Sequence, residues 1–259
     1  MIDIIRARIH QKYRTIRFPD APPPAMPDRF RGRPLIDTKL CPDGCRQCVE
    51  ACPTNAITFT ADRKPVVDLG KCLFCDDCKL ACPQHAIRHS DDYRLSVRKH
   101  DHLVVEEENA LVLAEALGGE LKKLLGRSLK LRQVSAGGCN ACEADVNVLG
   151  TVGWDLGRFG IQFVASPRHA DGLLITGPVT QNMKSALLDT YEAVATPKIV
   201  IAVGACAISG GPFIGHPEAN NGADALLPVD LYIPGCPPHP LTILDGLLRL
   251  LGRIPPARL

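Results

Sequence analysis

In the second half of the chain, short apolar runs alternate with stretches of helical periodicity. The predicted strands are KLRQV (130–134), IQFVA (161–165), GLLIT (172–176), KIVIAV (198–203) and VDLYI (229–233). Helices are predicted around 141–150, 183–195 and 241–251. Because strands that alternate with helices form parallel sheets, we expect an α/β unit with a doubly wound, mostly parallel sheet.

The first half of the chain lacks this alternation. Residues 1–37 are basic and rich in proline, which predicts an extended arm after a short first helix. The stretch EENALVLAEALGGELKKLLG (107–126) has helical periodicity and predicts a pair of connecting helices broken at Gly118 and Gly119. The expected domains are therefore an N-terminal arm (1–37), a cysteine-rich domain (38–90), a helical connector (91–127) and the α/β domain (128–259).

Charge excludes some partners and leaves others open. The net charge is +2, so nothing indicates nucleic-acid binding. The first 34 residues are different, because they carry three Asp but eight Lys or Arg: Arg6, Arg8, Lys12, Arg14, Arg17, Arg29, Arg31 and Arg33. This basic arm is expected to face anionic lipid, an acidic partner or water.

The chain is expected to stay in the cytoplasm and not to cross a membrane by itself. MIDIIRARIHQKYR places charges where a signal peptide needs an apolar segment. The longest apolar run, IVIAVGACAI (199–208), is interrupted by Gly204 and has the length of a strand. The cytosol keeps thiols reduced, so the 12 cysteines are expected to be ligands rather than disulfides.

Eight cysteines belong to an internal duplication. CRQCVEACPTNAI (45–57) and CDDCKLACPQHAI (75–87) match at a constant offset. The second copy completes a C-x2-C-x2-C-x3-C-P run, the spacing of bacterial two-cluster ferredoxins, in which the fourth cysteine binds the other cluster. One 4Fe–4S cluster is therefore predicted on Cys41, Cys45, Cys48 and Cys82, and a second on Cys72, Cys75, Cys78 and Cys52.

The first run departs from this pattern. Three residues, not two, separate Cys41 from Cys45, so the assignment of Cys41 is the weakest of the eight. Paired structural zinc sites are the alternative, because four-cysteine zinc sites also use C-x2-C. The tandem duplication and the C-P endings favour iron–sulfur clusters.

The four remaining cysteines are predicted to form a third site. Cys139 and Cys142 lie in GGCNACEAD (137–145), Cys206 in GACAISGGPF (204–213) and Cys236 in IPGCPPHP (233–240). Each of these loops follows a predicted strand, and ligands collect at the carboxyl ends of parallel strands. Three loops thus bring four thiolates to one more 4Fe–4S cluster. The glycines beside them are expected to provide backbone geometry (Gly204, Gly210, Gly211 and Gly235).

These motifs, with RFGIQFVASPRHADGLLITGPVT (158–180) and PVDLYIPGCPPHP (228–240), resemble the small subunit of membrane-associated, group 4 nickel–iron hydrogenases, as in formate hydrogenlyase. The same family includes the 20-kDa subunit of respiratory complex I. The resemblance covers about residues 128–252 and implies a flavodoxin-like fold with one 4Fe–4S cluster. Residues 38–90 resemble the separate ferredoxin-type subunit of those complexes and imply an α+β ferredoxin-like fold.

The resemblance also implies residue roles. The gap between Cys139 and Cys142 is typical of the hydrogenases, because complex I subunits have adjacent cysteines there. After the second cysteine the family often has Glu two or three residues on; here that region holds Glu143 and Asp145, candidate proton-handling groups. Arg158 and Arg168 match positions near the large-subunit interface and are candidate tuning groups, with surface ion pairing as the alternative.

Two histidines, His169, which matches a family position, and His239, are expected to be structural. No residue of this chain is assigned a catalytic role, and no nucleotide-binding fingerprint follows a strand.

The expected function is that of an iron–sulfur electron-transfer subunit in a membrane-associated nickel–iron hydrogenase complex of the formate-hydrogenlyase type. Its implied partners are a hydrogenase large subunit or a complex I 49-kDa-like subunit, membrane-arm subunits and other iron–sulfur subunits. They would hold it peripherally on the inner face of the cytoplasmic membrane. The alternatives are a complex-I-like NADH/quinone oxidoreductase module without nickel and a free ferredoxin-like carrier.

Overall fold

The computed structural model describes residues 2–12, 14–62, 64–106 and 111–254. Its helices are α1 (Ile2–Gln11), α2 (Gln47–Glu50), α3 (Asp77–Leu80), α4 (Gly119–Leu125), α5 (Ala141–Val148), α6 (Gln181–Ala193), α7 (Ala205–Ser209) and α8 (Pro240–Leu250). Its strands are β1 (Pro34–Ile36), β2 (Ile57–Phe59), β3 (Pro65–Asp68), β4 (Ile87–His89), β5 (Val104–Glu106), β6 (Leu129–Ser135), β7 (Ile161–Phe163), β8 (Gly172–Thr176), β9 (Ile199–Val203) and β10 (Leu231–Ile233).

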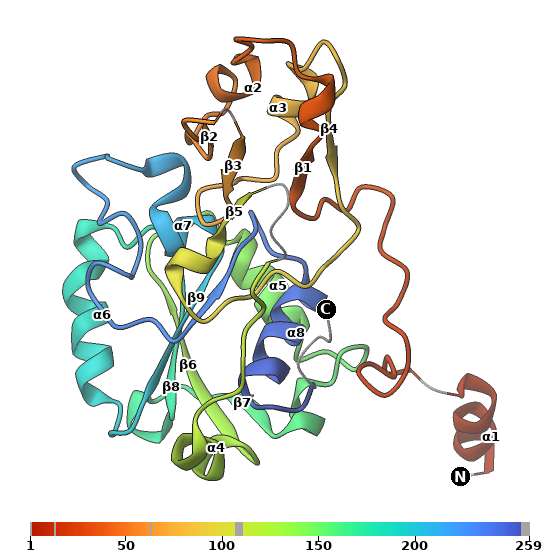
Figure 1. Ribbon diagram of the computed structural model, residues 1–259. Coiled ribbons are helices and arrows are strands. Elements are labelled where there is room, and N and C mark those ends of the chain that lie inside the picture. The colour runs from red at the N-terminus through yellow and green to blue at the C-terminus, as the bar shows by residue number, and fades with distance from the viewer. Residues whose placement is uncertain (1, 13, 63, 107–110, 255–259) are drawn as a thin grey trace.

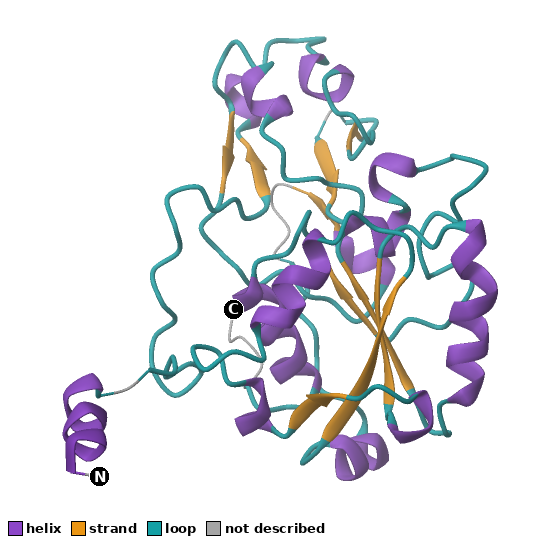
Figure 2. Ribbon diagram, turned by 180° about the vertical axis from the view of Figure 1, so that it is seen from behind, coloured by secondary structure: helices purple, strands orange, loops and turns teal. Residues whose placement is uncertain are grey.

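A five-stranded sheet forms the centre of the second half, in the order β10-β9-β8-β6-β7. Every pairing in it is parallel, which confirms the mixed α/β class and the parallel sheet predicted from the alternation. Helices cover both faces, as Figure 2 shows. Residues of α5 and α8 pack with Leu131 and Ile201 on one face, and Leu187 of α6 packs with Val134 and Val200 on the other.

The central strands are apolar on both faces, as expected for a sheet between two helical layers. All five residues of β8 are buried, and so are all five of β9. Because every strand runs in the same direction, the loops that leave β6, β8, β9 and β10 emerge at one edge of the sheet. This carboxyl edge is where the candidate site lies.

The cysteine-rich region stands over that edge (Figure 1). It holds two small antiparallel sheets, β1 with β4 and β2-β3-β5. Its core is continuous with the large sheet, because Leu69 and Leu103 share one buried cluster with Ala202 and Ile208. Its paired strands extend from β1 to β5 and so lie partly outside residues 38–90. Those limits were expected from the cysteines, and neither β1 nor β5 contains a cysteine.

The connector differs from its prediction. Residues 107–110 lie outside the described residues, and residues 111–118 contain no helix; only α4 follows them. The backbone amides of Ala114 and Leu117 donate to Ser96 O and Leu250 O, at 2.7 and 2.9 Å. Leu111, Ala114 and Leu117 are buried, so every third residue faces the core. Burial of every third residue is compatible with an extended segment as well as with a helix. Here the backbone hydrogen bonds to Ser96 and Leu250 favour the extended conformation.

The N-terminal arm begins with the predicted short helix. No residue of α1 is buried, and it stands apart from the rest of the molecule in Figure 1. Residues 14–33, which we call the strap, then run in extended form along the protein. Within the described part of the chain, no helix is long and apolar enough to cross a bilayer.

Candidate metal centres

Four cysteines meet at the carboxyl edge of the parallel sheet. Cys139 precedes α5, Cys142 lies in its first turn, Cys206 lies in α7 after β9, and Cys236 follows β10. Burial raises the pKa of Cys142 above its usual range, and the neighbouring charges of Cys206, Cys236 and Cys139 raise it further. The structure thus brings together the four residues that the sequence grouped.

Two glycines leave space for the sulfur atoms of Cys142 and Cys206. At Gly204, with φ of 89°, an added Cβ would lie 2.5 Å from Cys142 Sγ. At Gly211, with φ of 54°, an added Cβ would lie 2.8 Å from Cys206 Sγ. Both positions combine a left-handed backbone with a close approach, so neither accepts a side chain without displacing a thiol.

A second set lies in the cysteine-rich region. Burial raises the pKa of Cys72 to about 12, and the charges of Cys78, Cys52 and Cys75 add to this rise. Burial and the charges of Cys75 and Cys52 likewise raise the pKa of Cys78 to about 12. Cys52 comes from the other copy of the repeat, so a cysteine of the first copy acts electrostatically on two cysteines of the second.

In the first set, electrostatic interactions link three of the four predicted cysteines. Burial raises the pKa of Cys48, and the charges of Cys41 and Cys45 raise it further. Cys41 and Cys45 also line one cavity of about 280 Å³ despite the extra residue between them. Cys82 packs against the core cluster that contains Cys48.

The three sets lie in series. Burial raises the pKa of Cys236, and besides Cys139 the charge that adds to it is that of Cys75, from the second set. The charge of Cys48, from the first set, contributes to the raised pKa of Cys78. The second set therefore lies between the other two.

The donor chemistry fits iron–sulfur clusters. Each set concentrates thiols whose charges oppose one another, and a cationic metal group offsets that repulsion. The cradle at Gly204 and Gly211 leaves room for sulfur-bound atoms. Among the described residues, no group of three or more His, Cys, Asp or Glu side chains has the geometry to hold a single metal ion.

The two candidate carboxylates differ in their surroundings. Glu143 is only 5% exposed, and its Oε1 accepts hydrogen bonds from Ser135 Oγ and Thr176 Oγ1, both at 2.6 Å. Burial alone would raise the pKa of Glu143, but these hydrogen bonds outweigh it and the pKa is lowered. Burial raises the pKa of Asp145, which lines a cavity of about 280 Å³ together with Cys236.

The two candidate arginines lie away from the cysteines. Arg158 precedes β7 and Arg168 precedes β8, at the amino ends of the strands, whereas the cysteines follow strand ends. Arg158 Nη2 donates to Phe18 O at 2.7 Å, and its guanidinium lies 4.5 Å from the Phe159 ring centroid. Their role as tuning groups stays a prediction; the strand directions place both at the amino edge of the sheet, whereas the cysteine loops leave its carboxyl edge.

His239 has the geometry expected of a structural residue. His239 Nδ1 accepts a hydrogen bond from Leu241 N at 3.1 Å at the start of α8, and its ring contacts Phe30 and Trp154 edge-on. Burial lowers the pKa of His239. His169 is exposed.

Some residues of the site carry no sequence signal. Ser135 and Thr176 hold Glu143, yet they are single hydroxyl residues at strand ends, and only the strand register brings them together. Arg31 lies in a Pro-rich segment and reaches the second set. Its neighbours in the strap are also basic, so composition alone does not single it out.

Two families match the chain. The family described as NADH ubiquinone oxidoreductase, 20 Kd subunit, matches residues 139–250. The family described as 4Fe-4S dicluster domain matches residues 41–86.

Curated relatives match about half of the chain. A probable membrane-bound hydrogenase subunit mbhJ of Pyrococcus furiosus is 43% identical over 135 residues, 52% of this chain and 81% of the relative. Formate hydrogenlyase subunit 7 of Escherichia coli is 44% identical over 137 residues, 53% of this chain and 54% of the relative. An NADH-quinone oxidoreductase subunit of Carboxydothermus hydrogenoformans is 46% identical over 118 residues, 45% of this chain and 71% of the relative.

Proposed function

Because the chain belongs to the family of the NADH ubiquinone oxidoreductase 20-kDa subunit and carries a 4Fe–4S dicluster domain, we propose that it is the electron-transfer subunit of a membrane-associated nickel–iron hydrogenase complex of the formate-hydrogenlyase type. The observation that carries this proposal is the series arrangement of the three cysteine sets, in which the charge of Cys75 acts on Cys236 and that of Cys48 acts on Cys78. A row of sites from one end of the chain to the parallel sheet is what a relay to a partner subunit needs.

Each set would hold one 4Fe–4S cluster. The proposed ligands are Cys41, Cys45, Cys48 and Cys82 for the first cluster, Cys72, Cys75, Cys78 and Cys52 for the second, and Cys139, Cys142, Cys206 and Cys236 for the third. When bound, such clusters accept and release single electrons. The protein supplies the thiolates, the glycine cradle and the burial that keeps water away.

The domain assignments follow the same proposal. The cysteine-rich region would be an α+β ferredoxin-like domain, and residues 128–259 a flavodoxin-like domain. The short helices α2 and α3, each placed between the second and fourth cysteines of its run, support the first assignment. The parallel order β10-β9-β8-β6-β7 with helices on both faces supports the second.

The partners would be a hydrogenase large subunit at the third site, membrane-arm subunits and other iron–sulfur subunits. Phe213 and Ile214 support a covered surface there, because they are 46% and 38% exposed on the loop that follows Cys206. Such apolar exposure beside a cluster site is unfavourable for a free carrier. These partners would place the chain on the inner face of the cytoplasmic membrane.

A complex-I-like module with a 49-kDa-like partner is the second candidate. It is favoured by the 46% identity to an NADH-quinone oxidoreductase subunit. The two residues between Cys139 and Cys142 favour the hydrogenase. The alternatives differ in the metal of the large subunit, so nickel analysis of the co-purified complex separates them.

Metal analysis tests the proposal directly. The anaerobically purified chain should contain about twelve irons and twelve acid-labile sulfides, from three cubanes. C139S should lose the signal of the third cluster alone, and C75S that of the second. About eight irons with an unchanged dicluster spectrum would rule out the third cluster.

A further inference from the structure

The strap joins the two cysteine-bearing regions. At its start, Thr15 Oγ1 donates to Val152 O at 2.8 Å and Ile16 N donates to Gly153 O at 2.9 Å, both in the α/β half. At its end, Gly32 N donates to Ser90 O at 2.8 Å, directly after β4 of the cysteine-rich region. The segment that looked like a solvated linker thus runs from one region to the other.

Between these anchors, Arg31 contacts both sides of Cys75. Its Nη1 donates to Phe74 O at 3.3 Å, and its Nη2 lies 2.8 Å from Asp76 Oδ2. Phe74 and Asp76 are the two residues that flank Cys75 in the chain. A forked guanidinium is suited to such a two-point contact, which a lysine ammonium does not reproduce.

The backbone that Arg31 contacts is strained. Phe74 has φ of 53° and Asp76 has φ of 70°, both in the left-handed region that residues with a Cβ avoid. In the first copy of the repeat, the residue before Cys45 is Gly44, which adopts φ of 79° without that cost. The second copy therefore needs support from outside its own loop, of about 1–3 kcal/mol for each strained residue.

Asp76 is also held from its other side. His89 Nδ1 lies 3.1 Å from Asp76 Oδ1, a close contact without hydrogen-bond geometry. The His89 side chain is only 7% exposed, whereas that of Arg31 is 42% exposed. Replacing Arg31 thus disturbs the loop from its accessible side and leaves the buried packing of His89 in place.

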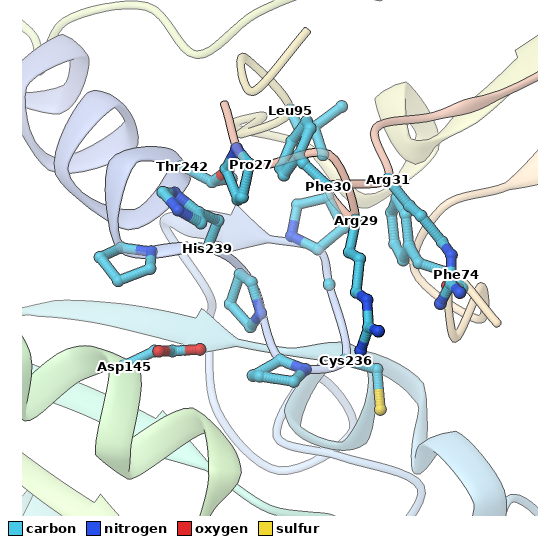
Figure 3. Close-up of a pocket in the computed structure, with 15 residues that line it drawn as sticks. Pro27, Arg29, Phe30, Arg31, Phe74, Leu95, Asp145, Cys236, His239 and Thr242 are labelled. Atoms are coloured by element: carbon cyan, nitrogen blue, oxygen red, sulfur yellow. The ribbon is translucent and has the colours of Figure 1, made fainter. Parts of the chain in front are cut away.

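Cys75 is the cysteine of the second set that faces the third. Its charge acts on Cys236, and one cavity of about 280 Å³ is lined by Arg31, Phe74 and Cys236. Figure 3 shows Arg31 beside Phe74 and, from the same strap, Arg29 extending toward Cys236. Any shift of the Cys75 loop therefore changes the junction between the two sets.

We propose that the N-terminal strap is the positioning element of the junction between the second and third clusters, and that Arg31 acts by fixing the loop around Cys75. The inference rests on the proposed function, because it needs clusters on both sets. Arg31 is a positioning residue, since it acts through Phe74 and Asp76 and not on the cluster itself.

The test uses the full chain with its clusters and compares R31Q, R31K and R94Q by redox-poised electron paramagnetic resonance. R94Q is the matched control, because Arg94 forms an equivalent pair with Asp92, at 2.7 Å and with 43% exposure, on the connector. R31Q should shift the reduction potential of the second cluster to a more negative value and alter its magnetic interaction with the third, with iron content unchanged. R94Q should leave both as they are.

R31K separates position from charge. It keeps the positive charge but not the fork, so the altered interaction between the clusters should persist in it. D76N should give the same spectral change as R31Q, and the double variant R31Q/D76N should add little to either. If R31Q leaves the potential and the spectrum unchanged, or if R31K restores both, the positioning role is wrong. Missing second- or third-cluster signals in the unmodified chain would instead refute the proposed function.

Discussion

The two cysteine-bearing regions would bind their proposed clusters in opposite ways. In residues 41–82 the ligands are neighbours in sequence, and the helices between them, α2 and α3, have only four residues each. In the α/β half the ligands lie on three separate loops, and a sheet with fully buried central strands brings them together. We therefore expect the fold of the first region to depend on its bound clusters. In the second region, we expect the cysteines to come together only because the sheet is folded.

The largest effect should follow from removing iron and sulfide. The cysteine-rich region has strands of only three or four residues, so it should lose its ordered structure without clusters. The parallel sheet should stay folded, because its core consists of apolar side chains from β6, β8, β9, α5, α6 and α8. Limited proteolysis of the apoprotein should cut within residues 38–90 and spare residues 128–252.

The holoprotein treated with the same protease is the control, and it should resist cleavage in both regions. Equal protection of both regions in the apoprotein would contradict the contrast, because the first region would then fold without its ligands.

A large effect is also expected inside the α/β core. Arg249 and Asp245 form a 2.7 Å ion pair on α8 with side chains only 5% and 1% exposed, and burial raises the pKa of Asp245. R249M leaves a buried carboxylate without its partner and should cost about 3–5 kcal/mol of unfolding free energy. The double variant D245L/R249M should recover most of this loss in denaturant titrations, while the dicluster spectrum stays unchanged in both. A double variant no more stable than R249M would contradict the argument.

The glycine cradle gives a more selective change. G204A places a Cβ 2.5 Å from Cys142 Sγ, so the third cluster should be lost and iron should fall by about four atoms per chain. The matched control is G215A, because Gly215 also has positive φ, 75°, but faces open space. G215A should cost about 1–2 kcal/mol of backbone strain and keep all iron. Equal iron loss in both variants would show that strain, and not the contact with sulfur, is responsible.

The sequence was sufficient to predict the features that depend on local patterns of apolar and polar residues. The five strands of the parallel sheet follow from their apolar runs, and the helices α5, α6 and α8 follow from the intervening periodicity. The grouping of Cys139, Cys142, Cys206 and Cys236 also followed, because each loop leaves the carboxyl end of a strand. The repeat and the ferredoxin spacing together predicted Cys52 with the second set, where its charge acts on Cys72.

Sequence failed where tertiary contacts override local preference. Residues 111–118 have helical spacing but form hydrogen bonds to Ser96 and Leu250, which no local pattern reveals. Arg158 was expected near a large-subunit interface because its motif resembles the family, and only the structure shows its contacts with Phe18 and Phe159. Arg31 was one of eight basic residues of the first 34, and only the structure shows what it contacts.

The smallest effect on stability should come from replacing exposed apolar residues, although replacing two of them should abolish assembly with the large subunit. Phe213 and Ile214 lie beside Cys206, and Leu80, which is 80% exposed, lies between Cys78 and Cys82. The double variant F213S/I214S and the control L80S should each change unfolding free energy by less than about 0.5 kcal/mol.

Affinity purification then separates the two regions. F213S/I214S should lose the co-purifying large subunit with all three cluster signals intact, because the third site is the end of the series that faces the partner. L80S should keep the large subunit, because the cysteine-rich region lies at the opposite end of the series of cysteine sets. Loss of the large subunit in L80S alone would reverse the proposed direction of the relay, since the partner would then dock on the region whose ligands are local in sequence.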